Sequence, residues 1–152
     1  MPSDHAYSRL SMSMPAGMLR ALGKLNVPIY RLTRGRVMGK VGQAPVLLLT
    51  SIGRRSGQPR TAPVLFLADG ERVVVIGSNA GNTKAPAWSH NIKANPDCEV
   101  QIRGERRDVR ARLTEGEERT ELWGKMNEQY AGFEDYDERT SRDIGVFVLE
   151  PR

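Results

Sequence analysis

The 152-residue chain contains one cysteine and two histidines, and this scarcity excludes several classes of protein. Cys98 has no second cysteine with which to form an internal disulfide, so the sequence fits a reducing, cytoplasmic setting. His5 and His90 lie far apart in the sequence, and with a single cysteine they do not make the ligand pattern of a zinc or iron–sulfur site. The sequence therefore predicts no metal-binding residues.

Long apolar runs and familiar catalytic groups are also missing. Runs such as Val46–Leu49 are much shorter than the roughly 20 residues of a transmembrane helix, and the N-terminus lacks the continuous apolar core of a signal peptide. No Ser/His/Asp group, nucleophilic cysteine or paired-carboxylate motif stands out. This pattern favours an enzyme whose chemistry is supplied by a bound cofactor.

The positive charge that is present is concentrated near the N-terminus. The hydrophobic (39%) and charged (27%) fractions are those of an ordinary single globular domain, with a net charge of +5. Residues 1–45 hold seven basic residues against Asp4 alone. An anionic small ligand or an anionic membrane explains this distribution at least as well as nucleic acid, which would require a broad basic face.

Residues 14–37 have the pattern of an amphipathic helix that bends or breaks at Pro28. Its apolar side is formed by Met18, Leu22, Leu25, Ile29 and Leu32, and its polar side by Arg20, Lys24, Arg31 and Arg34. Such a helix either packs over the core or lies on an anionic membrane through residues 14–38. We therefore divide the chain into a basic N-terminal arm, residues 1–43, and a globular domain, residues 44–152.

The rest of the sequence predicts antiparallel strands and two helices. The expected strands include Val46–Ser51 and Gly145–Glu150. Two further strands are joined by a turn at Asp69-Gly70, and the strands Cys98–Ile102 and Asp108–Leu113 are joined by a turn at Arg103-Gly104. The expected helices run from about Pro86 to Ala94 and from Thr114, which forms a capping box with Glu117, to about Tyr130. Because no strand–helix–strand alternation occurs, we expect an α+β fold or a small barrel with flanking helices.

The segment "GRRSGQPR", residues 53–60, is a candidate anion site. It places Arg54, Arg55, Ser56 and Arg60 in a turn between two strands, where guanidinium groups and backbone N–H groups can bind phosphate or carboxylate oxygens. It matches neither a Walker loop nor a G-x-G-x-x-G fingerprint. The alternative is that these arginines are ordinary solvated hairpin residues.

Two further segments suit a planar ligand. "IGSNAGNTKAPAWSHN" supplies Ser78 and Asn79 at a strand end, followed by Trp88 as a flat wall, although Trp88 also suits the core and His90 a helix surface. In the tail, three aromatic residues spaced three apart, Tyr130, Phe133 and Tyr136, form either a lid or part of the core.

These segments resemble the deazaflavin-dependent nitroreductases of actinobacteria, which use coenzyme F420. The matching stretches are "LLLTSIGRRSGQPR", "APVLF", "DGERVVVIGSNAG", "APAWSHNIKANPDCEVQI" and "YAGFEDYDERTSRDIGVFVLEP", between Ala44 and Pro151. The resemblance implies an α+β split β-barrel of about six mostly antiparallel strands, with flanking helices and an amphipathic N-terminal helix. Residues 44–152 would then be the deazaflavin-binding domain.

The resemblance also implies a set of site residues. Those expected to bind the cofactor are Thr50, Arg54, Arg55, Ser56, Gly57, Gln58, Arg60, Pro63, Ile76, Gly77, Ser78, Asn79, Ala87, Trp88, Asn91 and Phe133. Those expected to orient or protonate the acceptor are Ser78, Tyr130 and Tyr136. Leu65, Asn79 and Phe133 depart from the residues common in prodrug-activating members, which argues against efficient reduction of bulky bicyclic nitroimidazoles.

The implied activity is hydride transfer from reduced F420 to an electron-poor acceptor such as a quinone, an enone or a nitroaromatic. The small-molecule acceptor is the expected partner, with no nucleic acid, and peripheral contact with the inner face of the cell membrane is a further expectation. Two alternatives remain at this stage. One is a split-barrel relative that binds FMN or a haem-type ligand, and the other is a basic protein that docks on nucleic acid or anionic membrane.

Overall fold

A computed structural model of the chain describes residues 27–36, 40–41, 44–77, 85–129 and 144–152. The strands are β1 Lys40–Val41, β2 Ala44–Ile52, β3 Pro59–Asp69, β4 Arg72–Ile76, β5 Asp97–Ile102, β6 Glu105–Leu113 and β7 Val146–Pro151. The helices are α3 Ala87–Ala94, α4 Gly116–Gln129 and a helical segment over residues 27–33.

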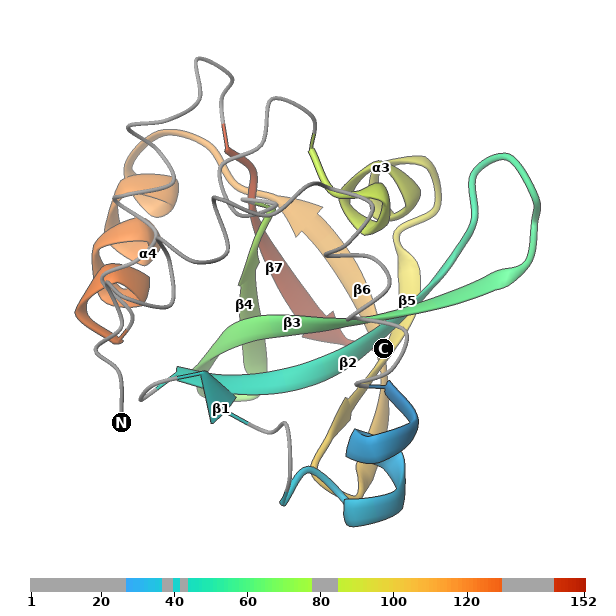
Figure 1. Ribbon diagram of the computed structural model, residues 1–152. Coiled ribbons are helices and arrows are strands. Elements are labelled where there is room, and N and C mark those ends of the chain that lie inside the picture. Colours follow the sequence, from blue (N-terminus) through green and yellow to red (C-terminus); the bar gives the residue numbers. More distant parts are fainter. Residues whose placement is uncertain (1–26, 37–39, 42–43, 78–84, 130–143) are drawn as a thin grey trace.

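All described strand pairs are antiparallel, and they close into a barrel (Figure 1). The order is β1-β2-β3-β4-β7-β6-β5, and a further pairing of β2 with β5 joins the two ends of the sheet. Barrel closure leaves six strands without a long free edge, which protects the sheet from edge-to-edge association. The expected split β-barrel fold is confirmed.

The inside of the barrel is filled by alternate residues of each strand, because successive side chains of a strand point to opposite faces. Leu47 and Leu49 of β2 pack there against Val75 of β4 and Val100 of β5. Cys98 also lies inside, and burial raises the pKa of its thiol to about 11. This buried neutral thiol is therefore a core residue rather than a reactive one.

The helices cover three different parts of the barrel (Figure 1). Helix α4 packs on its outer surface, where Leu122 and Met126 contact residues of β4 and β7. Helix α3 closes one end, since Trp88 and Ile92 enter the interior cluster and Trp88 meets Phe147 edge to face at 5.8 Å. No described helix is both long enough and apolar enough to cross a membrane.

The helical segment 27–33 is fastened to β2 and β5 by one tyrosine. Tyr30 is 1% exposed and packs against Val46 and Leu48. Its hydroxyl donates to the Val46 carbonyl at 2.9 Å and accepts from the Arg103 backbone N–H at 2.9 Å. Because both partners lie at the barrel surface, the segment is fixed in place and does not hang free.

Most sequence-based boundaries agree with the structure, and one local prediction is wrong. Thr114 does not cap α4, which begins two residues later; its hydroxyl donates to the Val146 carbonyl at 2.8 Å. The two-residue β1 was not expected. Pro28 lies within the helical residues 27–33, and the expected break there involves residues outside the described part of the chain.

Strand β6 carries a series of ion pairs that link neighbouring elements. Arg112 contacts Glu118 of α4 at 2.6 Å and Glu150 of β7 at 2.9 Å, and Arg110 contacts Asp97 of β5 at 2.9 Å. The hydrogen bond from Arg112 lowers the pKa of Glu118, and the one from Arg110 lowers the pKa of Asp97. The charges of Arg110 and Arg112 are therefore balanced by carboxylates of neighbouring elements.

Candidate functional site

The arginine hairpin, residues 53–60, is a tight turn between β2 and β3 that projects beyond the barrel (Figure 1). The Gly53 N–H donates to the Gln58 carbonyl and the Gly57 N–H to the Gly53 carbonyl, both at 2.8 Å. A Cβ at Gly53 would lie 2.5 Å from Ser56 Oγ, and Gly57 has a φ of +70°. Gly57 is therefore favoured by its positive φ, and Gly53 by the close approach of Ser56 Oγ and of the Gln58 carbonyl at 3.3 Å.

A buried asparagine of α3 holds the hairpin in position. Asn91 is 5% exposed, and its Oδ1 accepts from the Arg54 backbone N–H at 3.1 Å while its Nδ2 donates to Ser51 Oγ at 3.3 Å. Both ends of the amide are thus occupied by protein groups. Asn91 was expected to flank the deazaflavin, and here it positions the loop that carries the arginines.

The guanidinium groups of the hairpin lack acidic partners. Arg54, Arg55 and Arg60 are exposed, and among the described residues none of them has a carboxylate within ion-pair distance. Arg60 Nη2 donates to Ser56 Oγ at 3.5 Å. Such exposed cationic forks are free to bind an anion.

The backbone of the hairpin offers less to an anion than the sequence suggested. Four of its N–H groups, those of Gly53, Arg54, Gly57 and Gln58, donate to groups within the protein. In this structure these four N–H groups are therefore already engaged within the protein. The arginine side chains remain as the principal donors.

Two further expected residues, Thr50 and Pro63, lie on the outer face of the same ribbon beside Thr61, which was not expected at the site. Leu49 and Ala62 point into the barrel, so their chain neighbours Thr50, Thr61 and Pro63 face outward. The hydroxyls of Thr50 and Thr61 share a hydrogen bond of 2.8 Å, and all three residues are half-buried. We call Thr50, Thr61 and Pro63 the threonine strip.

Arg31 contacts the threonine strip, a contact that was not expected from the sequence. Its Nη2 donates to Thr61 Oγ1 at 3.3 Å from the helical segment 27–33. The helical pattern placed Arg31 on a solvated face, and only the packing of the segment on the barrel brings it to β3. No local signal in the sequence could have found this contact.

Other expected cofactor residues lie near the ends of β4 and α3. Ile76 is buried beneath α4, and the buried Gly77 donates its N–H to the Gly145 carbonyl at 2.9 Å. Ala87 is exposed at the start of α3, whereas Trp88 is 9% exposed and belongs to the core cluster. Trp88 is thus a core residue in this structure, which is the second of the two positions that the sequence suggested for it.

Five expected site residues lie outside the described residues: Ser78, Asn79, Tyr130, Phe133 and Tyr136. The strand end that precedes Ser78 is nonetheless placed, because a Cβ at Gly77 would lie 3.4 Å from Ser89 Cβ and 3.7 Å from Pro86 Cδ. The chain therefore leaves β4 beside the start of α3.

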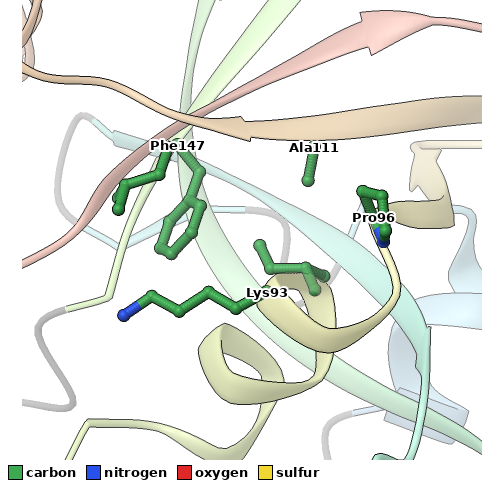
Figure 2. Close-up of a pocket in the computed structure, with 6 residues that line it drawn as sticks. Lys93, Pro96, Ala111 and Phe147 are labelled. Carbon is green, nitrogen blue, oxygen red and sulfur yellow. The ribbon is translucent and has the colours of Figure 1, made fainter.

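A cavity of about 190 Å³ lies elsewhere, between α3 and strands β6 and β7 (Figure 2). It is lined by Ile92, Lys93, Pro96, Ala111, Leu113 and Phe147. The Lys93 ammonium lies 6.0 Å from the centre of the Phe147 ring. The cavity contains none of the expected cofactor residues and is smaller than the roughly 300 Å³ of the smallest usual ligand pockets, so we assign no cofactor to it.

Comparison with known proteins identifies the family. The family model for F420H(2)-dependent quinone reductase matches residues 22–151. An F420H(2)-dependent quinone reductase of Mycobacterium tuberculosis is 37% identical over 133 residues, which cover 85% of this chain and 89% of that protein. A solved F420-H2 dependent reductase is 36% identical with a TM-score of 0.65, covering 70% of this chain and 94% of that one.

Two further solved structures extend the comparison. One, titled a domain-swapped dimer, is 33% identical with a TM-score of 0.67 and covers 84% of this chain and 95% of that one. The haem storage protein HutZ of Vibrio cholerae, at 18% identity and a TM-score of 0.56 over 84% of this chain and 88% of that one, shares the fold alone. The expected relationship to F420-dependent reductases is confirmed, and the chain belongs to the F420H(2)-dependent quinone reductase family, whose cofactor is coenzyme F420.

Proposed function

We propose that this chain transfers hydride from reduced coenzyme F420 to a quinone. The observation that carries the proposal is the arginine hairpin, in which three exposed guanidinium groups without a carboxylate partner in the described part of the chain are held on a rigid ribbon. The relatives are named for the same reductant and acceptor. The hairpin supplies the binding energy, and the coenzyme supplies the reducing chemistry.

The residues present fit a polyanionic coenzyme. A phosphate and an acidic tail need several cationic groups that are not already neutralised, and Arg54, Arg55 and Arg60 meet that need. Ser56 adds a hydroxyl beside Arg60, with Ser56 Oγ and Arg60 Nη2 3.5 Å apart. FMN offers one phosphate, which would engage fewer of these arginines, so the hairpin favours F420 over FMN.

The remaining expected residues would orient the reactants. Pro63 and the end of β4 would flank the planar ring system, Thr50 would contact the coenzyme from the threonine strip, and Gly57 and Gln58 would complete the turn. When bound, reduced F420 provides the hydride that passes to the acceptor. Ser78, Tyr130 and Tyr136 are proposed to hold the acceptor and to give it a proton, and Phe133 would exclude water.

We propose a wider range of acceptors than quinones, including enones and small nitroaromatics, because each is an electron-poor group that accepts hydride. Bulky bicyclic nitroimidazoles are expected to be poor substrates. Leu65 is half-buried between the cluster under α4 and the cluster under the segment 27–33. Because it is a leucine, it offers the acceptor no hydroxyl group at the position where prodrug-activating relatives often have a tyrosine.

Peripheral contact with an anionic membrane is a further part of the proposal. Leu32 is 87% exposed and Ile29 38% exposed on the segment 27–33, and Arg34 and Arg36, just after it, are exposed as well. Exposed apolar groups flanked by arginines suit a lipid interface. Leu32→Gln should reduce co-sedimentation with anionic vesicles, and sedimentation equal to that of the unchanged protein would argue against this contact.

The deciding experiment measures coenzyme binding and turnover with one protein preparation. The protein should quench the fluorescence of oxidised F420 with micromolar affinity or better, a range usual for cofactors. With reduced F420 and a water-soluble quinone, it should restore the visible absorbance of the oxidised coenzyme. No binding at tens of micromolar, or tight retention of FMN through purification, would reject the proposal.

A further inference from the structure

The helical segment 27–33 places a cationic group directly over the threonine strip. Arg31 Nη2 donates to Thr61 Oγ1 at 3.3 Å, and Thr61 in turn shares its hydroxyl with Thr50 at 2.8 Å. Thr50 is one of the residues proposed to bind the coenzyme. Arg31 thus contacts the proposed site from an element 30 residues away in the sequence.

The position of Arg31 is set by its neighbour in the chain. Tyr30 is buried to 1% exposure and makes hydrogen bonds to the Val46 carbonyl and the Arg103 N–H. A side chain anchored in this way fixes the backbone of the following residue to the barrel. The Arg31 guanidinium is therefore delivered to β3 by the fold and not by a free arm.

Most of the hydrogen-bonding capacity of Arg31 is unused. A guanidinium has five N–H donors, and one of them is engaged by Thr61. Within the described ranges Arg31 has no carboxylate in ion-pair distance, and the same holds for Arg54, Arg55 and Arg60. Three like charges on the hairpin and a fourth on the segment 27–33 beside it repel one another unless an anion lies among them.

β2 pairs with β5 only as far as Thr50, so the hairpin beyond that residue is a ribbon of two strands. Beyond the barrel the hairpin consists of β2 and β3 alone, with Arg60 next to Thr61 in the chain but on the opposite face. A flexible acidic chain held by the hairpin arginines can therefore continue onto the face that carries Arg31.

We propose that Arg31 is a fourth guanidinium of the coenzyme site and binds the phosphate or a carboxylate of its acidic tail. This inference rests on the proposed function. It assigns the segment 27–33 a part in coenzyme binding, in addition to covering the outer face of β2.

The test compares two variants that remove the same charge from neighbouring parts of the chain. Arg31→Gln removes the proposed contact. Arg36→Gln is the control, because Arg36 is exposed and lies away from the hairpin. The preceding residue, Gly35, packs against the turn between β5 and β6, where a Cβ built on Gly35 would lie 3.1 Å from Arg103 Cα. We expect Arg31→Gln to raise the Kd for F420 by about threefold to tenfold, and Arg36→Gln by less than about twofold.

Ligands of increasing charge identify the bound group. The deazaflavin riboside, which lacks phosphate and tail, should bind both variants and the unchanged protein equally. A loss that begins with the phosphorylated riboside assigns Arg31 to the phosphate, and a loss seen only with complete F420 assigns it to a tail carboxylate. The difference between Arg31→Gln and the unchanged protein should shrink at high ionic strength, because exposed charges are screened.

Two results would overturn the inference: equal Kd values for Arg31→Gln and Arg36→Gln, or an equal loss with the uncharged riboside. Arg31→Lys keeps the charge and should recover part of the affinity, which a purely structural role for the guanidinium would not give. If Arg31→Gln fails to fold, the comparison of Arg31→Lys with the unchanged protein still decides the question. If the unchanged protein does not bind F420, the proposed function fails instead.

Discussion

The arginine hairpin and strand β6 are both rich in arginine, but they differ in whether those charges have partners. On β6, Arg106, Arg107, Arg110 and Arg112 each lie within 4 Å of a carboxylate, at 3.8, 3.5, 2.9 and 2.6 Å respectively. In the described part of the chain the hairpin arginines have none. Arginine content alone therefore does not mark an anion site. The distinguishing feature is a set of arginines that have no carboxylate nearby.

The largest effect is expected from removing two hairpin charges. Arg55→Gln combined with Arg60→Gln should raise the Kd for F420 by about 100-fold or more, because each charge-assisted hydrogen bond is worth about 1.5–3 kcal/mol. Fluorescence titration measures this change. The matched control, Arg106→Gln with Arg110→Gln, removes the same charge from β6 and should change the Kd by less than about twofold. Equal losses would show that net charge, and not the hairpin, attracts the coenzyme.

A smaller loss is expected when the hairpin keeps its charges but loses its support. Asn91→Leu leaves the Arg54 N–H and the Ser51 hydroxyl without their partner, so the loop is less ordered. We expect about a tenfold rise in Kd and a loss of about 1–3 kcal/mol in the free energy of unfolding. Titration with F420 and urea unfolding give the two values. An unchanged Kd in a destabilised protein would limit Asn91 to a role in the fold.

Breaking the largest ion-pair group of β6 should affect stability and not binding. Arg112 is 44% exposed at its side chain, and it links Glu118 of α4 with Glu150 of β7. Because exposed ion pairs contribute little, Arg112→Gln should lower the free energy of unfolding by about 0.5–1 kcal/mol. Urea unfolding measures this, with the Kd for F420 as the internal control. A clear loss of coenzyme affinity would break the contrast between the two regions.

The smallest effect is a pH dependence that arises from the ion pairs of β6. Its arginines lower the pKa values of Glu118 and Asp97 in the folded protein, so below a pH of about 4 the unfolded state binds protons first. The stabilisation is present above that pH and is lost as the pH falls towards the lowered pKa values. Acid unfolding of Arg112→Gln should show a shallower decline, while the hairpin double variant should follow the unchanged protein.

Several elements were predictable because short stretches of sequence determine them. The turn at Gly70, with a φ of +63°, and the turn at Arg103 lie where the hairpin signals placed them. Helix α3 begins one residue after its expected start and ends at the expected Ala94. The local signal failed at Thr114, because its hydroxyl binds a carbonyl 32 residues away in preference to the nearby helix.

The sequence by itself determined the alternating strands, their turns and a glycine-containing turn with three arginines, since these depend on neighbouring residues. Only the tertiary structure decided that Asn91 supports the hairpin across 37 residues, that Trp88 lies in the core, and that Arg31 reaches Thr61. The physical reason is that burial and hydrogen bonding between distant segments are fixed by barrel closure. A local pattern gives the kind of residue present, whereas closure decides which residues meet.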